Sequence, residues 1–165
     1  METGEHVLMA IHKTLTAQKR LAERALEQLD SADFHWTPDS ESNSIAIIVK
    51  HVAGNMRSRW TDFLTSDGEK PDRNRDGEFI DDLGSAEQVL AVWEEGWERL
   101  FDTLATLTPE QLQRTVTVVG REHTVTEALL GQLGHYAQHV GQIVYLAKLR
   151  LGERWQTVSI PRRRA

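Results

Sequence analysis

Apolar residues recur every three or four positions in four separate stretches of the chain, and this periodicity restricts the fold more than any other feature. In the first stretch, residues 4–30, the apolar series is Leu8, Ile11, Leu15, Ala22, Ala25 and Leu29. The same spacing appears at 45–64, at 86–107 and at about 125–150. Such spacing places the apolar side chains on one face of an α-helix. The sequence therefore predicts four amphipathic helices.

The connections between these helices are long and polar. Residues 30–44 are rich in Ser, Asp and Pro, and residues 65–84 contain Gly and Pro without a sustained period. β-branched and polar residues alternate around Gly120, which predicts a short β-hairpin at 115–125. The whole pattern predicts an all-α fold, a four-helix bundle in a single domain over 1–165. Its connections are long enough to cross over the bundle.

Residue types that favour helix ends stand next to these stretches. The expected N-caps are Ser42 or Asn43 for the second helix, Ser85 for the third, and Thr124 or Thr126 for the fourth. Glu127 stands three residues after Thr124, which is the spacing of a capping box, and Gly152 fits the end of the fourth helix. Thr108 and Pro109 end the third helix or begin a short extra turn.

Composition excludes several classes of function. The chain has no cysteine, so any metal site must use His, Asp or Glu. The formal net charge of −6 argues against nucleic-acid binding, because such proteins usually present a basic surface to the phosphates. The basic clusters are short: Arg57 with Arg59, Arg73 with Arg75, and the terminal Arg162, Arg163 and Arg164, expected to be frayed.

The first residues of the chain do not resemble a signal peptide, because acidic residues precede the apolar ones and no cationic segment is present. The longest aliphatic run, Ile45–Val49, is too short to cross a bilayer. We therefore expect a cytoplasmic, soluble protein that acts on a small molecule and contacts neither membrane nor nucleic acid.

Two of the seven histidines, His135 and His139, lie four residues apart, so both imidazoles leave the same face of the fourth helix. They belong to a series that faces the expected core: Ala128, Gln132, His135, His139, Ile143 and Leu146. Two imidazoles at this spacing can bind one metal ion, as in HExxH zinc sites, although the glutamate of that motif is absent. Solvated or simply packed side chains are expected for the isolated histidines: His6, His12, His35 and His123.

A third ligand is available on the second helix. His51 lies at the margin of the apolar stripe and shares a helix face with Asn55, so it can meet the pair if the two helices are neighbours. Three imidazoles leave one coordination position open, which is typical of catalytic sites. The alternative is a polar layer of the core without metal, in which four side chains hydrogen-bond one another: His51, Asn55, Gln132 and His135.

Three separated segments carry a family pattern: NSIAIIVKHVAGN in the second helix, SRWTDFLTSDGEKP with NRDGEF after it, and GREHTVTEALLGQLGHYAQHVGQIVYLAK near the end. In these segments the chain resembles the DinB-like, or YfiT-like, superfamily of four-helix-bundle metalloenzymes. The resemblance implies one histidine from helix two and an H-x3-H pair from helix four, followed by Gly-Gln-Ile. Carried over to this chain, it implies that the metal ligands are His51, His135 and His139.

Members of this superfamily are similar to transferases that use bacillithiol or mycothiol, including the mycothiol-dependent maleylpyruvate isomerases. The resemblance thus implies a divalent-metal-dependent transferase or hydrolase that activates water or a low-molecular-weight thiol. Zn, Ni, Fe or Cu suits three imidazoles. Because the chain has no cysteine, any sulfur nucleophile must arrive as a cofactor.

Three further residues are candidates for cofactor binding. Arg73 and Arg75 can bind the carboxylates of a thiol cofactor, because guanidinium groups suit that geometry, and Asn55 can orient a ligand. The alternative for Asn55 is a polar role in the core. For the arginines it is pairing with acids of their own loop: Asp72, Asp76 or Glu78. Core positions are expected for the tryptophans on the apolar stripes: Trp60, Trp93 and Trp97.

Two other classes of function remain open from the sequence. The first is a metal-binding stress or interaction protein that catalyses no reaction. We expect the protein to be a homodimer. The second is a purely structural bundle with a polar layer at its centre. Metal content separates this second class from the other hypotheses.

Overall fold

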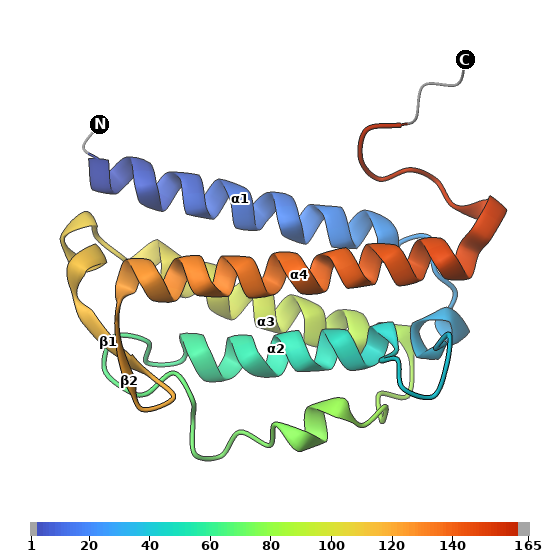
Figure 1. Cartoon of the computed structure of the whole chain (residues 1–165), viewed down its shortest axis with the longest axis horizontal. Coiled ribbons are helices and arrows are strands. Elements are labelled where there is room, and N and C mark those ends of the chain that lie inside the picture. The colour runs from blue at the N-terminus through green and yellow to red at the C-terminus, as the bar shows by residue number, and fades with distance from the viewer. Residues whose placement is uncertain (1–2, 162–165) are drawn as a thin grey trace.

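A computed structural model describes residues 3–161, and in it four long helices pack side by side (Figure 1). Their bounds are α1 (Thr3–Leu26), α2 (Ile45–Trp60), α3 (Ala86–Thr106) and α4 (Val125–Leu151). A two-stranded sheet precedes α4, with β1 (Thr115–Val118) antiparallel to β2 (Arg121–Thr124). The predicted all-α bundle and its short hairpin are therefore confirmed.

The direction in which each helix runs is related to the length of the connection before it. In Figure 1, α1 and α4 run one way while α2 and α3 run the other. The parallel pair α2 and α3 requires the segment from 61 to 85 to travel back along the whole bundle. This crossover lies along the outer side of α2 and contains the short 3-10 helix η2 (Asp76–Phe79). The long polar loop predicted at 65–84 is this crossover.

The helix caps match the sequence prediction for α3 and α4 but not for α2. Ser85 Oγ accepts from Gln88 N, and Thr124 with Glu127 forms the capping box. The N-cap of α2 is Ser44, not Ser42 or Asn43, because its Oγ accepts from Ile47 N and donates to Asp81 of the crossover. That second contact is long-range, so the local sequence does not reveal it.

Two helices also end earlier than the periodicity predicts. The first ends at Leu26 rather than at residue 30, because Ser31–His35 forms a separate 3-10 helix, η1. The second ends at Trp60 rather than at residue 64, because Asp62 has a positive φ of 48°, which breaks an α-helix. Phe63 nevertheless remains buried.

Aromatic side chains fill the centre of the bundle. Trp60, Trp93, Trp97 and Tyr136 are each at most 2% exposed, and the predicted core positions of the tryptophans are confirmed. At Gly96 the backbones of α3 and α2 approach so closely that a Cβ would lie 2.9 Å from the Cα of Ala53. The resulting tight contact of α2 with α3 fixes the orientation of the remaining α2 face toward α4 and the crossover.

Within residues 3–161, none of the helices combines the length and the apolar character that crossing a membrane requires. The terminal arginines Arg162, Arg163 and Arg164 lie outside the described residues.

Candidate metal centre

Three imidazoles meet where the middle of α2 faces the middle of α4. His51 Nε2 lies 3.4 Å from His135 Nε2, which in turn lies 3.0 Å from His139 Nε2. His135 and His139 are one helical turn apart on α4, as their spacing predicted, and His51 reaches them from α2. One nitrogen from each of the three rings lies within 4.8 Å of the other two, so the structure brings the three predicted ligands together.

The other ring nitrogen of two of these histidines is held by an acceptor. His51 Nδ1 donates to Glu78 Oε2 at 2.9 Å, and His139 Nδ1 donates to Gln142 Oε1 at 2.7 Å. A proton on Nδ1 leaves the lone pair on Nε2 of the same ring. Both rings therefore direct an Nε2 lone pair at the point where the three imidazoles meet. Such outer hydrogen bonds are typical of metal-ligating histidines.

Burial favours the neutral form of two of the three histidines, His135 and His139. Burial, together with the neighbouring His139 and His51, lowers the pKa of His135 to about 4. Burial likewise lowers the pKa of His139, although its hydrogen bond to Gln142 opposes this effect. Neutral imidazole is the form that binds a metal ion, so His135 and His139 need not lose protons at neutral pH.

The donor set fits a divalent transition metal. Three nitrogens bound to a tetrahedral zinc ion at about 2.0–2.1 Å would be about 3.3 Å apart, and the two closest pairs here are 3.0 and 3.4 Å apart. Without a cation, His135 Nε2–H could donate a hydrogen bond to only one of the two neighbouring imidazoles. The buried Nδ1 of His135 has no hydrogen-bond partner among the described residues. The geometry therefore suits a shared cation better than a closed hydrogen-bond network.

The crossover supplies the acid that orients His51. Glu78 in η2 is 6% exposed and packs against Gly54 of α2, where a Cβ would lie only 2.7 Å from its Cδ. Burial would raise the pKa of Glu78, but hydrogen bonds from Arg73 and His51 outweigh burial and hold that pKa below its ordinary value. Glu78 is therefore a carboxylate. Its neighbour Phe79 covers His51, with ring centroids 4.9 Å apart.

Sequence reasoning identified Glu78 only as a possible partner of the loop arginines and missed its contact with His51. The two residues are 27 positions apart, and neither periodicity nor spacing connects them. Gln142 was part of the Gly-Gln-Ile phrase of the family resemblance. Its position three residues after His139 on α4 is a local signal that could have identified it.

Asn55 belongs to a buried polar chain next to the cluster. Tyr136 Oη donates to Asn55 Oδ1 at 2.9 Å and accepts from Trp60 Nε1 at 2.9 Å. This is the core polar role that the sequence left open for Asn55. The proposed layer of His51, Asn55, Gln132 and His135 does not form as such, because Asn55 pairs with Tyr136 and Gln132 Oε1 has no partner in residues 3–161.

The two loop arginines lie in different environments. Arg73 donates from Nε and Nη2 to Glu78 and from Nη1 to Glu69. Its contact with Glu78 is the pairing within the loop that the sequence left open as an alternative. Arg75 is exposed on the crossover. Cofactor binding by Asn55, Arg73 or Arg75 stays a prediction. His35 is also not isolated, because its Nδ1 pairs with Asp81 at 2.7 Å.

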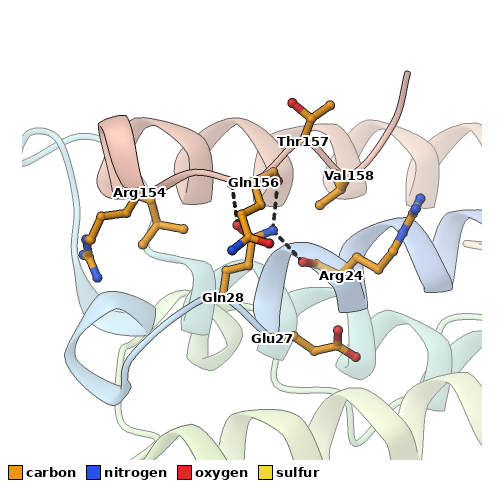
Figure 2. A pocket seen from close by; sticks show the side chains of 8 residues that line it. Arg24, Glu27, Gln28, Arg154, Gln156, Thr157 and Val158 are labelled. Carbon is orange, nitrogen blue, oxygen red and sulfur yellow. Dashed lines mark hydrogen bonds between the residues drawn. The ribbon is translucent and has the colours of Figure 1, made fainter. Parts of the chain in front are cut away.

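A groove of about 560 Å³ lies at the end of the bundle, between the end of α1 and the segment after α4 (Figure 2). A pair of hydrogen bonds between Gln28 and Gln156 spans it, and Arg24 and Arg154 lie at its sides. None of its lining residues belongs to the histidine cluster. The groove is therefore separate from the candidate metal centre.

The family comparison covers nearly the whole chain. The model of a family described as "Protein of unknown function (DUF1572)" matches residues 2–164, including every residue of the histidine cluster. No curated protein matches the chain. Because the match extends over far more than half of the sequence, this chain belongs to the DUF1572 family.

Proposed function

We propose that this protein is a divalent-metal-dependent enzyme that activates water or a low-molecular-weight thiol for group transfer or hydrolysis. The observation that carries the proposal is the convergence of three imidazoles, in which His135 Nε2 lies 3.4 Å from His51 Nε2 and 3.0 Å from His139 Nε2. Glu78 and Gln142 hold the Nδ1 atoms of His51 and His139. The resemblance to the DinB-like superfamily and its thiol-dependent transferases supports the same assignment.

His51, His135 and His139 would hold the ion. A bound divalent cation lowers the pKa of water or of a thiol and so supplies a nucleophile near neutral pH. Three protein ligands leave room for that nucleophile. Because the chain contains no cysteine, a sulfur nucleophile would come from a cofactor.

The residues around the ligands have distinct supporting roles. Glu78 and Gln142 keep the Nε2 lone pairs of His51 and His139 directed inward. Arg73 binds both oxygens of Glu78, so this carboxylate has a fixed orientation. Phe79 covers one face of His51 and limits the access of water from the side of the crossover.

Metal content tests this proposal directly. Protein purified without a histidine tag and analysed by elemental mass spectrometry should contain about one equivalent of a transition metal per chain. The variant His139→Ala should lose most of it, whereas His6→Ala, which removes an exposed histidine of α1, should retain it. Metal at background level in the unsubstituted protein, or equal metal in both variants, would contradict the proposal.

Turnover is tested separately on the metal-loaded protein. Electrophiles are offered with and without small thiols, and the expected result is transfer or hydrolysis that disappears in His139→Ala. Tight metal binding without any turnover would instead support a metal-binding protein of the same fold.

A further inference from the structure

Arg59 is a buried cation to which residues 3–161 offer no hydrogen-bond acceptor. Its side chain projects from the last turn of α2, and the residue is 5% exposed. Among the described residues, its Nε and Nη1 atoms are fully buried and donate to nothing. A buried charge without a partner is costly, and proteins rarely retain one without a role.

The place of Arg59 relative to the histidine cluster follows from the helices. His51, Asn55 and Arg59 are spaced by four residues along one face of α2, and each is at most 7% exposed. The antiparallel α4 lies along this face, where Asn55 meets Tyr136. Arg59 thus lies beside the α2–α4 contact, about 12 Å along the helix axis from His51.

Helices α2 and α4 carry four of the unpartnered buried polar atoms. Six buried polar side-chain atoms in the described part of the chain lack a hydrogen-bond partner. Two of them are the indole nitrogens of Trp93 and Trp97, whereas the other four belong to Arg59, Gln132 and His135. Burial first, then the adjacent imidazoles, and finally the charges of Arg73 and Arg59 lower the pKa of His135, so Arg59 is within electrostatic reach of the cluster.

Two acids of the crossover, Asp67 and Glu69, act electrostatically on Arg59 but hydrogen-bond to other groups. Asp67 accepts from the backbone amides of Glu69, Val119 and Gly120, and Glu69 accepts from Arg73. Gly68 packs directly on the guanidinium, where a Cβ would lie 2.5 Å from Nη1. The crossover therefore covers Arg59 without neutralising it through a hydrogen bond.

We propose that Arg59 binds a small-molecule carboxylate whose reacting end lies at the histidine cluster. The inference rests on the proposed function and adds the class of ligand to it. The ligand would carry its carboxylate several bonds away from the reacting atom, because Arg59 is two helical turns from His51. Either the thiol cofactor or the electrophilic substrate can carry this carboxylate.

Charge balance favours a carboxylate. The charged groups that act on Arg59 include the cation Arg73 and the anions Glu69 and Asp67, and these three with Arg59 itself leave no net charge. Three neutral imidazoles with a divalent ion would add two positive charges. A thiolate and one carboxylate together supply two negative charges, whereas a thiolate with a phosphate dianion would leave an excess.

The first arm of the test uses cobalt-loaded protein, because thiolate binding to cobalt produces a charge-transfer absorbance. The protein is titrated with 6-mercaptohexanoic acid, whose carboxylate carbon is six bonds from the sulfur, and with its neutral amide. A charge-assisted hydrogen bond makes us expect about 10–100-fold tighter binding of the acid. Arg59→Gln should remove this preference and leave the affinity for the amide unchanged, while Arg59→Lys should keep part of it.

Arg57→Gln is the matched control. Arg57 lies two residues before Arg59 on the same helix, but its side chain is 56% exposed and pairs with Glu95 on α3. Its removal should leave the preference for the acid intact. Circular dichroism and cobalt stoichiometry verify that each variant is folded and loaded, and Arg59→Lys keeps the test valid if Arg59→Gln does not fold.

The second arm uses metal-free protein and succinate, with binding measured by calorimetry in the unsubstituted protein and in the same three variants. Binding that depends on Arg59 in both arms assigns the carboxylate to the thiol. Dependence in the succinate arm alone assigns it to the electrophilic substrate. If neither arm depends on Arg59, the inference is overturned. If cobalt does not bind but succinate binding requires Arg59, only the proposed metal function fails.

Discussion

Glu78 shows how much of the candidate centre depends on one side chain. It accepts from His51 through one oxygen, receives two hydrogen bonds from Arg73, and packs against the backbone at Gly54. The glycine is necessary because any side chain at that position would collide with the carboxylate. A single residue of the crossover thus sets the orientation of a ligand on α2.

Replacing this carboxylate should weaken metal binding. In Glu78→Gln, the charge that supports the Nδ1–H of His51 is lost, and we expect the affinity for zinc to fall by about 10–100-fold. Competition with a chelating dye measures the affinity. Glu69→Gln is the control, because Glu69 also pairs with Arg73 but does not touch His51. Equal losses in the two variants would show that Glu78 acts only through Arg73.

At the scale of elements, close contact of α2 with α3 determines which face of α2 remains for the histidine cluster. Gly96 permits this contact, since its missing Cβ would lie 2.9 Å from Ala53 Cα and 3.2 Å from Met56 Sδ. Three of the α4 glycines, Gly131, Gly134 and Gly141, have open space where a Cβ would stand. Close packing of α3 on α2 therefore requires a glycine at position 96, whereas no neighbouring atom requires a glycine at the three α4 positions.

This contrast predicts opposite effects of the same substitution. Gly96→Ala should lower the free energy of unfolding by about 1–3 kcal/mol, because the two helix backbones must move apart. Gly131→Ala should raise it by up to about 1 kcal/mol, because alanine reduces the conformational entropy of the unfolded chain and favours helix. Urea denaturation of the metal-free variants measures both values. A neutral Gly96→Ala would mean that α2 and α3 can separate without loss.

At the scale of the whole molecule, one ion pair joins segments from the two ends of the chain. Arg150 in the last turn of α4 donates to Asp33 of η1 at 2.6 Å, and Asp33 is 3% exposed. Burial would raise the pKa of Asp33, but the hydrogen bonds from Arg150 and from the amide of Asp30 outweigh burial and hold that pKa below its ordinary value of 3.8. The pair therefore links α4 to the connection between α1 and α2.

The lowered pKa of Asp33 predicts a pH-dependent stability. A carboxylate whose pKa is lower in the folded state stabilises that state fully above its unfolded pKa, and this contribution disappears as the pH falls through the folded pKa. The unsubstituted protein should be about 1–2 kcal/mol more stable than Asp33→Asn at pH 7. The difference should begin to decrease below about pH 4 and should disappear only as the pH falls through the lower pKa of the folded state.

Urea denaturation from pH 3 to pH 7 measures this difference. Asp102→Asn, which alters an exposed carboxylate on α3, serves as the control and should differ little from the unsubstituted protein at any pH. A gap between the unsubstituted protein and Asp33→Asn that stays constant down to pH 3 would contradict the assigned role of the charge.

The sequence by itself determined the features that depend on neighbours within a turn or two. Periodicity predicted the four helices, Gly120 marked the turn of the hairpin, and the spacing of His135 and His139 placed both imidazoles on one face. These features are local because helix and turn geometry relates residues only a few positions apart.

Tertiary structure alone decided the contacts that complete the site. His51 was a candidate ligand from its helix face and from the family resemblance, but its approach to His135 spans 84 positions and depends on the antiparallel packing of α2 on α4. The course of the crossover brought Glu78 to His51 and left Arg59 covered but unpaired. Such contacts follow from how whole elements pack, and the pattern of residues within one element does not contain that information.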